Sequence, residues 1–130
     1  EVETTWAFTG VACMLTALVY TLESISGAHL NPAVSLASSL AGKAPWKITG
    51  AYWGAQFLAG IMAGFYCKVM LPDSHWQQAR LFAPVNWWYA ALTEAFYTCM
   101  ICFVVLNVAC TDANQGNQFY GLAIGFVVIA

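Results

Sequence analysis

Four long apolar blocks constrain this chain more than any other feature of its sequence. Residues 6–22 and 48–67 contain no charged residue, residues 87–110 contain only Glu94, and a fourth block covers residues 119–130. A helix that crosses the hydrocarbon core of a bilayer needs about 20 predominantly apolar residues. The first three blocks are long enough to span, and the fourth is about half a span. The sequence therefore predicts an all-α membrane protein.

Composition and charge support a lipid environment and exclude other classes. Hydrophobic residues make up 61% of the chain and charged residues 8%, against about 45–50% and about 25% in ordinary soluble domains. The net charge is −2 and no basic run occurs, so we expect no nucleic-acid partner. The chain opens on Glu1 without a basic segment or a cleavage site, so we expect a partial chain and no signal peptide.

Five cysteines lie in or beside the apolar blocks, at positions 13, 67, 99, 102 and 110. Cys99 and Cys102 have the spacing of metal ligands, but no second pair or neighbouring His completes a site. Buried small apolar side chains are the better interpretation. We expect no metal and no cofactor.

The order of apolar and polar segments predicts a single transmembrane channel domain. We expect membrane spans at about residues 6–23, 48–71 and 87–110, and the start of a further span at 118–130. Residues 72–86 form a polar connection, and residues 24–42 form a re-entrant loop and half-helix. Lys43 and Lys47 on one side balance Lys68 and Arg80 on the other, so the positive-inside rule leaves the topology undecided.

The half-helix is predicted from its end signals. Asn31 is a favoured N-cap residue, Pro32 suits the first helical position, and Gly42 suits the position past the helix end. About ten residues at 1.5 Å each cover only about half of a bilayer. Irregular backbone beside such a helix is tolerated at membrane depth only where it is buried in protein or lines an aqueous cavity.

This arrangement predicts a chemistry for the loop. The carbonyl groups of Gly27, Ala28 and His29 would form a row of hydrogen-bond acceptors along a cavity wall. The Asn31 oxygen would cap the half-helix while its NH₂ group donates to a molecule in the pore. The positive helix end would repel cations and hydronium. We therefore hypothesise a pore that conducts neutral molecules and rejects protons and ions.

The segment Ser-Gly-Ala-His-Leu-Asn-Pro-Ala-Val, residues 26–34, resembles the first signature loop of the aquaporin and aquaglyceroporin family. Further similar positions are Tyr52, Gln56, Gly60, Glu94, Gly121 and Gly125, so the resemblance covers nearly the whole chain. It implies a bundle of six spans and two half-helices, normally a homotetramer, with one pore in each subunit. It also implies that Asn31, Pro32 and Ala33 line the pore. The first span and the second half-helix with its filter arginine are not in this sequence.

Alignment with the family places the second-helix filter position at about Val11, where water-selective members carry a bulky aromatic residue. A valine there favours a wider filter, but a small shift of the alignment would bring Trp6 or Phe8 to this position. The sequence therefore leaves the choice between water, glycerol and other solutes open, together with gating and the state of the second half-helix.

Several polar residues have a structural and a functional interpretation. For Glu94, the resemblance favours a buried carboxylate that accepts hydrogen bonds from a pore-side loop over a proton relay. We expect Gln56 to hydrogen-bond between helices, and His29 to pack beside the pore rather than to sense pH or bind a metal. Glu23 is expected to be solvated or to cap a helix end. Small residues at four-residue spacing in 50–64 predict a tightly packed helix.

Three functions remain open at this stage. The leading one is a passive multi-pass membrane channel for water and small neutral solutes such as glycerol, in the plasma membrane or an organelle membrane. The second is a non-conducting structural or adhesive subunit that keeps the fold, within a larger membrane assembly. The third, an intramembrane enzyme that uses His29 with Ser26 or Ser35, lacks an orienting acid nearby, so we predict no enzyme activity.

Overall fold

The computed structural model describes the backbone of residues 2–70 and 86–129, and the side chains from residue 6 onward. The predicted connection at 72–85, with His75 and Arg80, lies outside the described residues, as do residues 71 and 130. The described elements are all helical: α1 (Val2–Ser26), α2 (Pro32–Leu40), α3 (Trp46–Met70), α5 (Trp87–Ala109), the 3₁₀ turn η1 (Asp112–Asn114) and α6 (Tyr120–Phe126). The predicted all-α fold is confirmed.

Two of the described helices are long and apolar enough to cross a membrane by length and composition. They are residues Trp6–Ser26 of α1 and the whole of α5, Trp87–Ala109. Helix α3 has 25 residues, or about 37 Å at 1.5 Å per residue, but it does not reach the same hydropathy. Its glycine, tyrosine, tryptophan and glutamine residues lower its average hydropathy. Helix α2 has nine residues and is too short to span.

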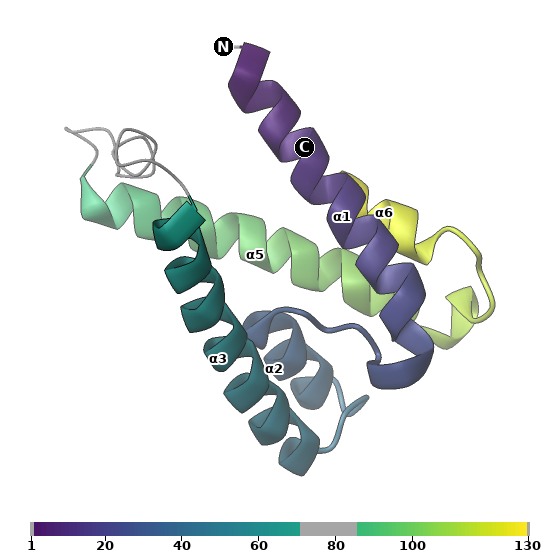
Figure 1. Ribbon diagram of the computed structural model, residues 1–130. Coiled ribbons are helices and arrows are strands. Elements are labelled where there is room, and N and C mark those ends of the chain that lie inside the picture. The colour runs from purple at the N-terminus through teal and green to yellow at the C-terminus, as the bar shows by residue number, and fades with distance from the viewer. Residues whose placement is uncertain (1, 71–85, 130) are drawn as a thin grey trace.

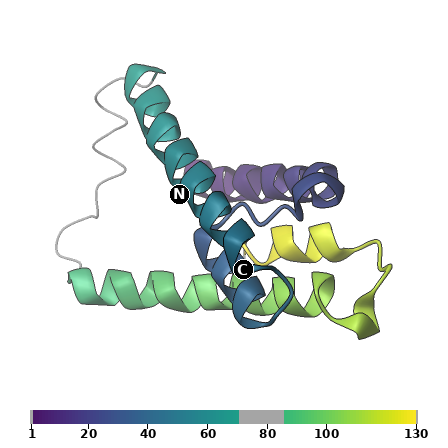
Figure 2. The same cartoon turned by 90° about the horizontal axis from the view of Figure 1, so that it is seen from below.

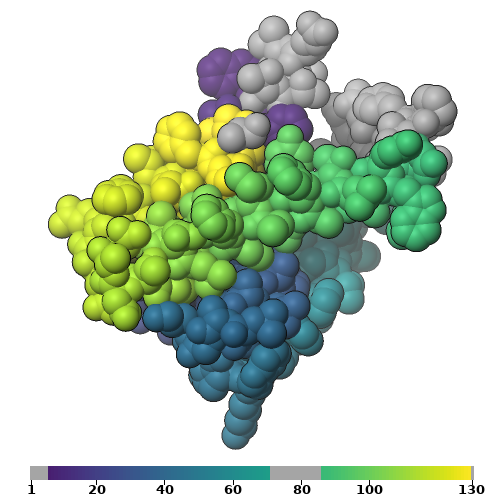
Figure 3. Space-filling model, turned by 180° about the vertical axis from the view of Figure 1, so that it is seen from behind, coloured from purple at the N-terminus to yellow at the C-terminus, as the bar shows by residue number. Residues whose placement is uncertain are grey.

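The helices form a chain of neighbours from α1 through α6, α5 and α2 to α3 (Figures 1 and 2). Helix α6 packs along α1 and also contacts α5, while α2 lies between α3 and α5. Seen from behind, α5 runs across the molecule with α6 on one side and α2 on the other (Figure 3). The buried apolar cluster of Val19, Ala28 and Ile124 joins α1, the loop after it and α6. The core thus surrounds the loop that precedes α2.

Two glycines allow α6 to approach α1 closely. A Cβ atom added at Gly125 would lie 1.8 Å from Thr16 Oγ1 and 2.9 Å from the Ala12 carbonyl oxygen. A Cβ atom at Gly121 would lie 2.9 Å from the Tyr20 ring. The small-residue spacing at Gly121 and Gly125 therefore marks a contact that larger side chains would prevent.

The small-residue face of α3 is different. A Cβ atom at Gly50, Gly54, Gly60 or Gly64 would meet no described atom within 4 Å. The tight packing expected for this face is therefore not present among the described residues. The physical reason is that α3 contacts α2 through its Trp53 and Gln56 side chains and the end of α1 through Tyr52, which leaves the small residues without a described partner. Large apolar side chains of α3 and α5 are also exposed, as expected for surfaces covered by lipid or by further helices.

We predict that Gly125→Ala destabilises the protein by about 1–3 kcal/mol, because the added methyl group overlaps Thr16 and a buried helix contact cannot relax freely. Thermal unfolding in detergent, followed by circular dichroism, measures the change. The control is Gly10→Ala on α1, where a Cβ atom meets nothing within 4 Å. Equal melting temperatures for the two variants would show that the α1–α6 contact does not limit stability.

Candidate functional site

The loop between α1 and α2 has a strained backbone. Gly27 has φ +72°, and two residues with side chains, Ala28 and Leu30, have φ +45° and +48°. The left-handed region costs a residue with a Cβ atom about 1–2 kcal/mol. Such a conformation persists only where the surrounding structure holds it. The contacts of this loop therefore decide whether it keeps its shape.

Asn31 joins the loop to the half-helix. Its backbone is extended, at φ −146° and ψ 129°, and its Oδ1 atom accepts a hydrogen bond from the Ala33 N–H at 2.8 Å. Pro32 occupies the first helical position, where its missing N–H and fixed φ suit a helix start. No described residue accepts a hydrogen bond from the Asn31 NH₂ group, so this donor stays available to a molecule beside it.

Helix α3 holds the loop and the half-helix through three donors. The Tyr52 hydroxyl donates to the Ser26 carbonyl oxygen at 2.5 Å, and Trp53 Nε1 donates to the Pro32 carbonyl oxygen at 2.9 Å. Gln56 Nε2 donates to Ser35 Oγ at 3.1 Å. Since these three side chains share one face of α3, a single helix fixes both ends of the strained segment.

Ser35 is the centre of a polar network. It is fully buried, donates its hydroxyl proton to the Asn31 carbonyl oxygen, and accepts from Gln56. His29 Nδ1 lies 3.1 Å from the same oxygen. Because a hydroxyl has one proton and two lone pairs, His29 Nδ1 must be a donor here. The neutral His29 ring then keeps Nε2 as an acceptor.

A cavity of about 110 Å³ lies against this loop. The loop residues from Gly27 to Asn31 form one wall, and the other walls come from α1, α2, α5 and α6. The residues outside the loop are Leu15, Val19, Glu23, Val34, Ile101, Val105, Ala109, Tyr120 and Ile124. The site is thus a mostly apolar cavity whose polar lining comes from the loop and from the Glu23 and Tyr120 side chains.

The polar side is made of backbone acceptors. No described donor is hydrogen-bonded to the carbonyl groups of Gly27, Ala28 or His29, although Tyr52 and Trp53 bond to the carbonyls that flank them. Backbone acceptors that lack a protein partner are satisfied by water or a ligand. Together with the NH₂ group of Asn31, they offer hydrogen bonds to a small molecule in the cavity.

Comparison with known proteins agrees with this geometry. The profile of the family described as "Major intrinsic protein" matches residues 2–130. The chain belongs to this family. It is 35% identical over 116 residues to Aquaporin NIP2-1 of Oryza sativa subsp. japonica. The aligned residues are 88% of this chain and 38% of the relative. It is 33% identical over 126 residues to Nodulin-26 of Glycine max, and this alignment covers 94% of the chain and 46% of the relative.

The chain therefore spans about two fifths of the length of the curated relatives it matches. No solved structure matches it significantly. Members of the major intrinsic protein family are integral membrane channels, so this chain is part of a membrane protein with that fold.

The structure places the remaining predicted residues as follows. Pro32 and Ala33 begin α2, and Ala33 donates to the Asn31 side chain. Val11 lies on α1, one turn before Leu15, and lines an open surface cavity with Leu15 and Leu30. It is 58% exposed and does not line the cavity beside the loop.

Glu94 is exposed on α5, and no described residue donates a hydrogen bond to it. The described part of the chain therefore does not bury Glu94 as expected. Helix α5 packs through its C-terminal half, where Ile101, Val105 and Ala109 line the cavity, whereas its N-terminal half extends away from α2 and α6 (Figure 2).

Two polar residues that line the cavity were not predicted to do so from the sequence. Glu23 was expected only to be solvated or to cap a helix, and Tyr120 was not considered. Glu23 lies two turns after Leu15 and one turn after Val19 on α1. Residues at this four-residue spacing share one face of a helix, so the spacing could have placed Glu23 on the same face as Leu15 and Val19. No comparable spacing points to Tyr120, because its place depends on how α6 returns to α1.

We predict that Ser35→Ala lowers stability by about 2–3 kcal/mol, because His29 and Gln56 lose their shared acceptor in a buried position. Thermal unfolding of the purified protein in detergent measures the loss. Ser24→Ala, at an exposed position of α1, is the matched control and should change stability little. A Ser35→Ala variant as stable as this control would contradict the network.

Proposed function

We propose that this chain forms one half of a passive transmembrane pore for water and small neutral solutes. The observation that supports this most is the row of unbonded carbonyl groups next to the free NH₂ group of Asn31, on the wall of a cavity between helices. A channel member of the family needs such groups, because a molecule that leaves bulk water must regain its hydrogen bonds.

The proposed conduction step is an exchange of hydrogen bonds. A water molecule or a solute hydroxyl donates to the carbonyl groups of Gly27, Ala28 and His29 and accepts from Asn31 Nδ2. The opposite wall, with Leu15, is mostly apolar, and its polar side chains are Glu23 and Tyr120. The strained loop presents the acceptors before the solute arrives, so little reorganisation is needed as it passes.

Charge exclusion follows from the half-helix. The N-terminus of α2 carries about half a positive charge, and Asn31 and Pro32 place it beside the cavity. A cation or hydronium meets this charge after losing its water shell, which makes its passage unfavourable. Neutral molecules experience no such barrier.

The range of solutes depends on the filter. Val11 is the proposed second-helix filter residue, and its small side chain supports a passage wide enough for glycerol or a similar solute. We propose that the complete protein lies in a lipid bilayer as a homotetramer. The alternative function is a non-conducting structural subunit with the same fold.

The pore is tested with the full-length protein in proteoliposomes, by stopped-flow light scattering under a sucrose gradient. We predict that Asn31→Asp lowers the water permeability by about tenfold, or about 1.4 kcal/mol on the barrier. An aspartate still caps α2, but it removes the NH₂ donor and adds a negative charge beside the carbonyl row.

The matched control is Asn86→Asp. Asn86 is the N-cap of α5 and accepts from the Trp88 N–H, so the substitution is chemically identical but lies away from the cavity. It should keep the wild-type permeability. Wild-type shrinkage no faster than that of empty liposomes would reject the pore and favour the structural subunit. Rapid re-swelling in glycerol would support the wide filter.

A further inference from the structure

A second, polar cavity adjoins the first. It has a volume of about 310 Å³ and is lined by Glu23, Asn114, Gln115, Asn117 and Tyr120, together with Val108, Ala109 and Gly116. Glu23, Ala109 and Tyr120 line both cavities, so the two are neighbours. We call this second cavity the vestibule.

Each amide side chain of the vestibule donates at least one hydrogen bond to the protein. Asn114 Nδ2 donates to the Asn107 carbonyl oxygen, and Asn117 Nδ2 donates to those of Val108 and Asn114. Gln115 Nε2 donates to the Asp112 carboxylate. Because each amide nitrogen faces an acceptor, the orientation of the amides is fixed. The Asn114 and Gln115 oxygens accept no hydrogen bond from a described residue, and each of these two amide groups keeps one further N–H.

The Glu23 carboxylate adds a charged acceptor to the vestibule. It is exposed, and no described residue forms an ion pair or a hydrogen bond with its side chain. It lies in the last turn of α1, which contains no basic residue. The last residues of α5, Val108 and Ala109, also line the vestibule. Two negative helix ends therefore add to the negative charge.

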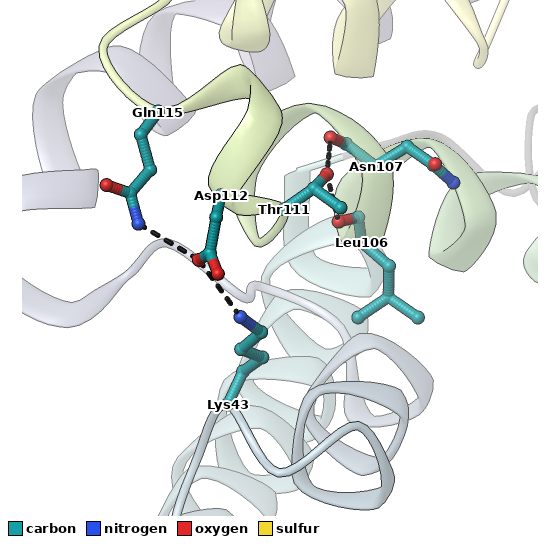
Figure 4. Close-up of polar contacts among 6 residues, drawn as sticks. All are labelled: Lys43, Leu106, Asn107, Thr111, Asp112 and Gln115. Carbon is teal, nitrogen blue, oxygen red and sulfur yellow. Dashed lines mark hydrogen bonds and ion pairs between the residues drawn. The ribbon is translucent and has the colours of Figure 1, made fainter.

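No described lysine or arginine lines the vestibule to compensate. Lys43 lies near it, but its Nζ atom pairs with Asp112 at 3.5 Å (Figure 4). Asp112 also accepts the bond from Gln115 in the same view. The vestibule thus combines an unpaired carboxylate, amide oxygens and the aromatic ring of Tyr120, which together suit a cation that carries several N–H donors.

We propose that the vestibule binds a guanidinium-type cation, with its N–H groups directed at Glu23 and its face near Tyr120. Such a cation has donors only, which suits the Glu23 carboxylate and the amide oxygens of Asn114 and Gln115. It cannot continue past the positive end of α2, so it occupies the mouth and blocks water. The block of water permeation rests on the proposed pore function, whereas binding of the cation does not.

The test uses methylguanidinium chloride and its neutral analogue methylurea, on the full-length protein. Binding is read from saturation-transfer NMR of the probe's methyl protons, and block from water permeability in proteoliposomes with the probe on both sides. We expect methylguanidinium to bind and to lower the permeability at least twofold, and methylurea at the same concentration to do neither. Block by both probes alike would overturn the proposal.

Two variants locate the site. Glu23→Gln removes the charge, and Gln115→Lys places a cation in the exposed loop without altering Glu23. Each should reduce binding and block at least fivefold. Glu94→Gln removes a carboxylate that lines neither cavity, and its fractional block should match wild type. Undiminished block in both Glu23→Gln and Gln115→Lys would overturn the proposal.

The two proposals fail separately. Methylguanidinium binding that depends on Glu23, in a protein without water permeability, would support the site and reject the pore. Water permeability without block and without a methyl signal would support the pore and reject the site.

Discussion

The hydrogen bonds from α3 to the loop and the half-helix are the interaction on which the rest of the structure depends. The loop contains two non-glycine residues at positive φ, which are unfavourable by themselves. Tyr52 and Trp53 bond to carbonyls on either side of this strained stretch, and Gln56 reaches the buried Ser35. They leave the intervening carbonyls unbonded. The same contacts thus maintain the strain and preserve the acceptors that a permeating molecule would use.

Helix ends give the passage its electrostatic profile. The half-helix directs its positive end at the cavity, while α1 and α5 end beside the vestibule with their negative ends and Glu23. On the proposed function, a cation is attracted by Glu23 and repelled by the positive end of α2, and neutral solutes meet neither effect. Glu23 lies in the wall that both cavities share, and the helix end lies at Asn31.

Much of the fold follows from short-range patterns. Apolar length predicted the helices, and Asn31 and Pro32 predicted the start of α2, because capping and proline geometry are local properties. The role of Gly121 and Gly125 also agreed with their spacing, since close approach requires small residues. The glycines of α3 follow the same pattern without a described partner. Spacing alone therefore indicates that a contact is possible, and not which surface fills it.

The sequence by itself determined the membrane environment, the half-helix and the residues of the signature loop, because hydropathy and capping act within a few turns of chain. Tertiary structure decided which groups share a cavity. It brought Tyr120 beside Glu23 across nearly a hundred residues, and it left Glu94 on an exposed stretch of α5. It also directed amide N–H groups of the vestibule to nearby backbone carbonyls and to the Asp112 carboxylate. These outcomes depend on how α6 returns to α1, a long-range packing arrangement that no local pattern encodes.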